Sequence, residues 1–249
     1  MNVYSQGNIQ KTRHSMVDTL ARELAVTETI LRSRNTFFEE IRDNIGLQEK
    51  IRAMGLSSFV LLALYGAVLG SSHSLWQALS SAFKLPLLFL ATALICIPTL
   101  YFFNILFGAR QNLNQNLALI LTPITVTAIL LFSFAAITLF FMLTTSQYQF
   151  FKLLNVVFFA VAGITGMVFL VQGMRVVSIT QEEGGSARKW VLRFWILIYA
   201  FVGSQMAWTL RPFIGYPNAP FELFRQRGGN FYGDILVSIG ELLGFFILR

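Results

Sequence analysis

Apolar residues along this chain gather into long runs separated by short polar stretches. A helix of about 20 apolar residues crosses a hydrocarbon core about 30 Å thick. Five runs of at least this length predict membrane-spanning helices at residues 53–71, 85–107, 117–143, 150–174 and 190–210. Together with a sixth run near the C-terminus, they indicate an all-α, polytopic bundle of about six transmembrane helices.

The last run, residues 231–248, is the ambiguous one. It contains Asp234 and Glu241, and an unpaired carboxylate at the centre of a bilayer costs about 2.5 kcal/mol or more. Gly240 and Gly244 form a GxxxG pair, however, which allows a helix to pack closely against another. We favour a sixth span with its acids turned inward; five spans and an interfacial helix are the alternative.

Two polar stretches have amphipathic patterns. In residues 1–50 the apolar residues recur at helical spacing, and Thr36 with Glu39 fits a capping box. We expect two short amphipathic helices there, on the membrane or on a partner, with a solvated tail as the alternative. Residues 74–84 predict a helix lying flat in the membrane interface. The domains are thus a cytoplasmic region, 1–50, and a membrane bundle, 51–249.

Charge supports a membrane protein and gives it an orientation. Charged residues make up 12% of the chain, far below the quarter or so found in soluble proteins. The net charge of +7 does not come from a basic patch with aromatic residues, so we expect no nucleic-acid partner. With six spans, fourteen Lys and Arg residues fall inside and five outside. This asymmetry predicts that both termini are cytoplasmic.

The loop between the last two runs, residues 211–230, is rich in arginine, proline, glycine and aromatic residues, a mixture that predicts a rigid, structured loop. Its arginines precede three polar residues spaced along one helix face. Two interpretations remain open: a polar pathway for ions, or ion pairs that hold the loop on the bundle. The candidate residues are Arg211, Arg225, Arg227, Asp234, Ser238 and Glu241.

Proline and small residues predict how the helices pack. Pro98 lies inside the second run, where it removes a backbone hydrogen bond, so we expect a kink whose freed carbonyl faces protein. Small residues four positions apart allow helix backbones to approach closely. Three such pairs occur: Ala162 with Gly166, Ala200 with Ser204, and Gly240 with Gly244.

Candidate chemistry is sparse. The single Cys96 provides no disulfide framework, and the two histidines, His14 and His73, make bis-histidine haem ligation improbable. Ser81 and Lys84 match an S-x-x-K spacing, but we assign them to the interfacial helix. We therefore expect no catalytic residue, no cofactor and no metal.

The runs KLPLLFLATALICIPTLYFFNILFG and MAWTLRPFIGYPNAPFELFRQRGGNFY resemble those of a group of uncharacterised multi-spanning bacterial membrane proteins, some from photosynthetic bacteria. The resemblance covers most of residues 55–248. It implies membrane topology and a bacterial inner membrane, with a photosynthetic membrane as one option, and no site residues, because the group has no established catalytic residues.

These observations favour a non-enzymatic membrane component that anchors, scaffolds or accompanies another complex. Its expected partners are the lipid bilayer and other membrane chains, including copies of itself. The alternative is a channel or transporter for a small ion or solute that uses the helix face carrying Asp234 and Glu241.

Overall fold

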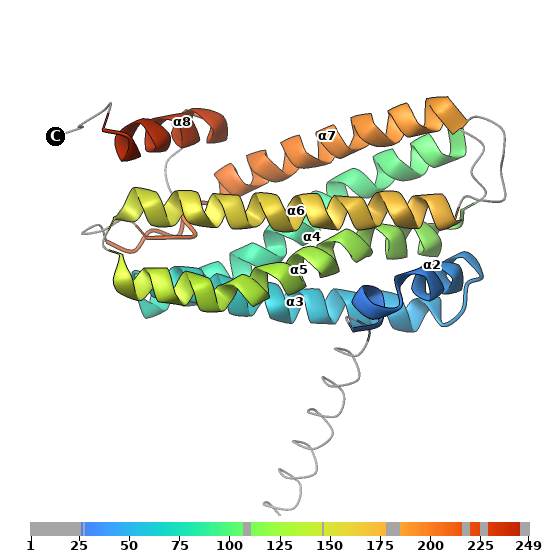
Figure 1. Ribbon diagram of the computed structural model, residues 1–249, viewed down its shortest axis with the longest axis horizontal. Coiled ribbons are helices and arrows are strands. Elements are labelled where there is room, and N and C mark those ends of the chain that lie inside the picture. Colours follow the sequence, from blue (N-terminus) through green and yellow to red (C-terminus); the bar gives the residue numbers. More distant parts are fainter. Residues whose placement is uncertain are drawn as a thin grey trace, which may run out of the picture.

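The computed structural model describes residue 26 and residues 28–106, 111–145, 147–177, 185–215, 220–224 and 229–244, with backbone alone for 103–106 and 185–189. Throughout this part of the chain every regular element is a helix, which confirms the all-α prediction. The helices (Figure 1) are α2 (Arg34–Arg42), α3 (Leu47–Ser71), α4 (Leu75–Leu106), α5 (Leu113–Thr144), α6 (Tyr148–Val177), α7 (Gly185–Leu210) and α8 (Phe231–Leu242).

Within the described residues, five helices are long and apolar enough to cross a membrane: α3, α4, α5, α6 and α7. They lie side by side along the long axis of the molecule (Figure 1). Large apolar side chains such as Leu94, Ile164 and Leu197 are exposed on the outside of the bundle, as expected where lipid is the solvent. The chain is an integral membrane protein.

The two ends of the bundle, the loop end and the α2 end, differ in the segments that they hold. The loop end holds the turn at residues 72–74, the end of α5, the start of α6 and the segment 211–215, whereas the α2 end holds α2 and the start of α5 (Figure 1). The end of α8 lies at the loop end. The helices α2 and α8 are therefore at opposite ends of the bundle; the two chain termini lie outside the described residues.

Glycines bring the central helices together. A Cβ atom on Gly66 of α3 would lie 2.3 Å from the backbone oxygen of Ser81 in α4. A Cβ atom on Gly166 of α6 would lie 2.6 Å from the backbone oxygen of Pro123 in α5. These separations leave no room for a larger residue, so the absence of a side chain is what permits each contact.

A buried polar cluster ties α3, α5 and α6 together. The hydroxyl of Tyr65 donates to Oδ1 of Asn155 at 2.8 Å and lies 3.4 Å from the hydroxyl of Thr138. The amide of Asn155 donates in turn to the carbonyl of Phe151 at 2.8 Å. All three polar side chains are buried and bonded, as an apolar environment requires.

The predicted interfacial helix and second span are one continuous helix, α4, so this prediction is wrong. Its polar residues face the segment after α7 and do not need lipid headgroups as partners. Pro98 lies inside α4 but is exposed, contrary to the expectation that it faces protein. The reason is that α7 packs on another side of α4, where Trp195 donates to the carbonyl of Cys96 at 3.3 Å.

The described part of the N-terminal region is packed into the bundle. Phe37, Phe38 and Ile41 of α2 have no exposed surface, and Phe38 fills the space beside Gly173 of α6. The helix begins at Arg34 after Ser33, whose side chain makes no capping bond, so the capping box predicted at residue 36 is not the helix start. Most of the first predicted amphipathic helix lies outside the described residues.

The last helix, α8, has 12 residues, so at about 1.5 Å per residue it extends about 18 Å and is shorter than a hydrocarbon core. Gly244 follows its end with φ of +78°, a left-handed conformation that terminates helices. The predicted GxxxG pair is thus not a packing face: Gly240 is buried within α8, whereas Gly244 is a stop signal just after it.

Candidate functional site

A stripe of three polar residues on α4 organises the loop end. Gln77, Ser81 and Lys84 are spaced four and three residues apart, which places them on one helix face. All three are buried, with at most 5% of their surface exposed. We call this set the α4 polar stripe.

The α4 polar stripe bonds to backbone carbonyls of the segment that follows α7. The amide of Gln77 donates to the carbonyl of Pro212 at 2.8 Å, and the hydroxyl of Ser81 donates to that of Phe213 at 2.6 Å. An irregular backbone cannot satisfy its own carbonyls, and a buried one without a donor is costly. The stripe therefore supplies the donors that this segment lacks.

Lys84 is the charged member of the stripe. Its ammonium group donates to the carbonyl of Leu223 and, at 3.4 Å, to that of Pro212. It also lies 4.9 Å from the centre of the Phe224 ring, a cation–π distance. Lys84 thereby joins residues 212 and 223, on the two sides of the loop.

Further contacts fix the start of the loop. Gly215 lies so close to His73, in the turn between α3 and α4, that a Cβ atom would be 2.2 Å from the imidazole ring. The guanidinium of Arg211 lies 3.3 Å from the centre of the Trp208 ring. These contacts give residues 211–215 the structured character that the sequence predicts.

The acidic residues of α8 pair with α6. Asp234 forms an ion pair with Lys152 at 2.7 Å, and the Glu241 carboxylate accepts a hydrogen bond from the amide of Gln149. Ser238 is buried and donates to the backbone carbonyl of Asp234. These contacts hold α8 against the first turns of α6.

The other predicted site residues are dispersed. Arg225 and Arg227 lie outside the described residues, so the prediction that they meet the acids stays a prediction. Ala162 is buried and its carbonyl accepts from Thr127 of α5 at 3.2 Å. Ala200 is exposed on α7, and Ser204 lies 3.0 Å from the hydroxyl of Tyr232 in α8. The last contact joins α7 to α8.

Sequence reasoning missed the α4 polar stripe as a unit. The signal was present, because Gln77, Ser81 and Lys84 share one face while Trp76 and Phe83 occupy another. The S-x-x-K match concealed it. In the structure the hydroxyl of Ser81 is committed to a backbone carbonyl, which is a structural role.

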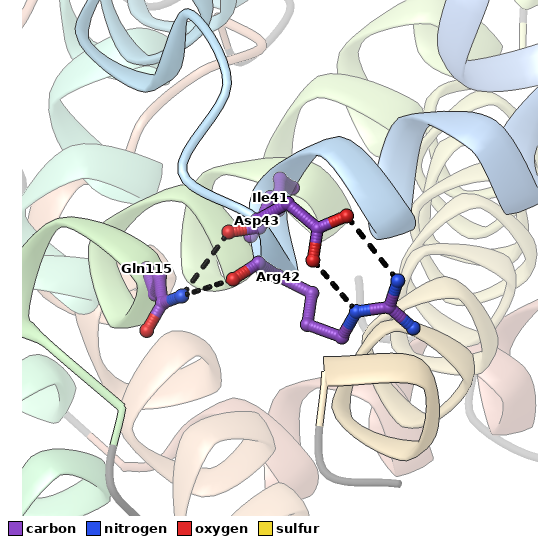
Figure 2. Close-up of polar contacts among 4 residues, drawn as sticks. All are labelled: Ile41, Arg42, Asp43 and Gln115. Carbon is purple, nitrogen blue, oxygen red and sulfur yellow. Dashed lines mark hydrogen bonds and ion pairs between the residues drawn. The ribbon is translucent and has the colours of Figure 1, made fainter. Parts of the chain in front are cut away.

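The α2 end is held by a different arrangement (Figure 2). The amide of Gln115, near the start of α5, donates to the carbonyls of Ile41 at 3.2 Å and of Arg42 at 2.8 Å. These carbonyls end α2 and lack partners within it. The Arg42 guanidinium donates to both carboxylate oxygens of Asp43 and holds the pKa of that carboxyl below its usual value.

Comparisons with models of known protein families, with curated proteins and with solved structures returned no match. Over the described residues, no three His, Cys, Asp or Glu side chains come together as a metal site would need.

Proposed function

We propose that this chain is a non-enzymatic integral membrane protein that anchors, scaffolds or accompanies another membrane complex. The observation that carries the proposal is that the polar side chains at the loop end bond to other parts of the same chain. The α4 polar stripe binds the loop, and the predicted pathway acids Asp234 and Glu241 bind α6. Groups bonded in this way stabilise a rigid scaffold, which favours pairing over conduction.

The finer topology belongs to the same proposal. It has five spans, α8 as a helix that does not cross, and a cytoplasmic α2 end in a bacterial inner membrane. The amphipathic N-terminal region joins the cytoplasmic end through α2. The excess of Lys and Arg in the segments before α3 supports this orientation, because such residues are retained in the cytoplasm.

The face most open to a partner is on α7. In the most apolar stretch of α7, 11% of the residues are buried within the chain, against 56% for α3. Ala200 is exposed on this helix and is small, so that a partner helix could approach its backbone there. We assign this face to another membrane chain or to a second copy.

Gentle purification from native membranes tests the proposal. Mass spectrometry of the bound chains and a mass for the particle should show stoichiometric partners or a homo-oligomer. Ala200→Trp should reduce their recovery several-fold, because a bulky side chain separates packed helices but is accepted by lipid. Ile164→Trp, on the exposed face of α6, is the matched control. A monomeric particle with no stoichiometric chain would contradict the proposal.

Flux through reconstituted vesicles distinguishes the alternative. If the helix face of α8 conducted ions, Asp234→Asn would change the flux without changing the fold. Our proposal expects no flux from the parent protein and a weakened attachment of α8 in this variant, because the ion pair with Lys152 is lost.

A further inference from the structure

The segment after α7 turns back along the bundle. At Gly215, which packs on His73, the segment is level with the turn between α3 and α4. By Leu223 it has returned to Lys84. Lys84 lies about 13 Å along the axis of α4 from Leu75, at about 1.5 Å per residue. The Lys84 side chain leans toward the start of the helix, so its ammonium group is less deep than its backbone. Leu223, which it contacts, still lies deeper in the bundle than the start of α4.

The start of α8 lies deeper still. The hydroxyl of Tyr232 is 3.0 Å from that of Ser204, which precedes the end of α7 at Leu210 by about 9 Å along the helix. From there α8 runs outward to Glu241, which contacts Gln149 in the first turn of α6. Figure 1 shows the consequence: α7 stops short of the ends of α5 and α6, and α8 lies alongside α6 in the remaining length.

The outward surface of these elements is apolar. Leu223 is 53% exposed, Phe224 59% and Leu236 69%, and most other exposed positions of α8 carry large apolar side chains. The neighbouring first turns of α4 expose Trp76 and Phe83, and that surface continues into the lipid-facing side of the same helix. Large exposed apolar side chains of this kind suit acyl chains and not water.

Three backbone carbonyls of the segment meet the condition for lying within a membrane. Irregular backbone at membrane depth is tolerated where protein satisfies its polar groups. The carbonyls of Pro212, Phe213 and Leu223 receive hydrogen bonds from the α4 polar stripe. Satisfied carbonyls on one side and apolar side chains on the other are what a re-entrant segment requires.

We propose that residues 211–215 and 220–224, together with α8, form a re-entrant segment embedded in the bilayer leaflet at the loop end. Leu223, Phe224 and Leu236 contact its acyl chains. In this placement Gly215 lies near the surface of the leaflet, Leu223 and Phe224 lie within it, and α8 runs back toward the same surface. This placement holds whether or not a partner chain binds α7.

Single-cysteine labelling in vesicles tests the proposal. With Cys96, the chain's one cysteine, replaced by alanine, new cysteines at Phe224 and Leu236 are labelled with a bimane fluorophore. The protein is reconstituted in phosphatidylcholine that carries nitroxide groups on its acyl chains. Both labels should be quenched at least about twofold more than one at Gln147, in the exposed α5–α6 turn, because quenching requires a position within the hydrocarbon region.

Ile164, exposed in the middle of α6, is the control for a lipid-facing position. Quenching by aqueous iodide should follow the reverse order. If either test position behaved like Gln147, the proposal would be overturned. A second measurement needs no substitution: a phosphatidylcholine with an acyl-chain diazirine should crosslink to residues 220–224 and to α8 in the unaltered protein, and labelling confined to α3–α7 would also overturn it.

Discussion

The two ends of this bundle are closed by different kinds of interaction. At the α2 end, a regular helix buries Phe37, Phe38 and Ile41 completely, and Gln115 bonds to its last carbonyls. At the loop end, irregular backbone is held by the amide, hydroxyl and ammonium groups of the α4 polar stripe. A helix satisfies most of its own backbone and can attach through apolar side chains, whereas a loop must be given donors.

This contrast predicts opposite sensitivities. The α2 end should respond most to cavities and the loop end most to loss of polar groups. Four measurements of unfolding in detergent, from the largest expected effect to the smallest, test this difference in sensitivity.

Phe38→Ala should produce the largest loss of stability. It leaves a cavity between α2 and Gly173 of α6, and truncation of a buried phenylalanine costs about 3–5 kcal/mol. The free energy of unfolding, measured by denaturant titration, should fall accordingly. Phe140→Ala is the control, because this side chain is 60% exposed and should change little. Equal losses would show that α2 is not part of the core.

Lys84→Met should rank second, at about 1–3 kcal/mol, because the partly buried carbonyl of Leu223 loses its donor while that of Pro212 keeps Gln77. Lys50→Met is the matched variant at the α2 end. Lys50 donates to the carbonyl of Ile45 and pairs with Glu40 close to water, so its loss should cost less than about 1 kcal/mol. Proteolysis near residues 220–224 should accelerate in the first variant alone. The reverse order would contradict the contrast between the ends.

Gln77→Leu and Gln115→Leu compare the same side chain at the two ends. Gln77 is nearly fully buried, so its loss leaves the carbonyl of Pro212 without its closest donor and should cost about 1–2 kcal/mol. Of the carbonyls bonded by Gln115, that of Ile41 keeps the backbone N–H of Asn44 and the partly buried one of Arg42 can turn to water, so we expect about 1 kcal/mol or less there. If Gln115→Leu were the more damaging, the end of α2 would be drier than its position suggests.

Asp43 should give the smallest effect, which appears as a dependence on pH. The hydrogen bond from Arg42 lowers the pKa of Asp43 in the folded chain. The stability that the Arg42–Asp43 pair contributes is therefore fully present above the pKa of Asp43 in the unfolded chain, about 4. It is lost as the pH falls through the lower pKa of the folded chain. Thermal stability measured down the acidic range should show a small decrease that Asp43→Asn removes. An unchanged profile in the variant would mean that the pair contributes nothing.

Several features could be predicted from the sequence because they depend on local composition. The run at residues 53–71 lies within α3, and the runs at 117–143 and 150–174 lie within α5 and α6. The boundaries of α4 were wrong, because the polarity of residues 74–84 was assigned to lipid headgroups. Its partners are carbonyls more than 130 residues away along the chain.

For the candidate site too, the sequence indicates which residues need partners, and the structure shows which partners they have. The sequence could indicate that Asp234 and Glu241 require partners, because bare carboxylates are costly in a bilayer. It suggested the nearby arginines. Among the described residues, the structure pairs them with Lys152 and Gln149 of α6, which are close in space and distant in sequence.

By itself the sequence determined an all-helical membrane bundle, because an apolar run of about 20 residues in lipid can satisfy its backbone only as a helix. Tertiary structure decided which polar side chains meet, how far α8 extends and where the segment after α7 lies. Those outcomes depend on contacts between distant residues such as Lys84 and Leu223, and neither hydropathy nor spacing along the chain records such contacts.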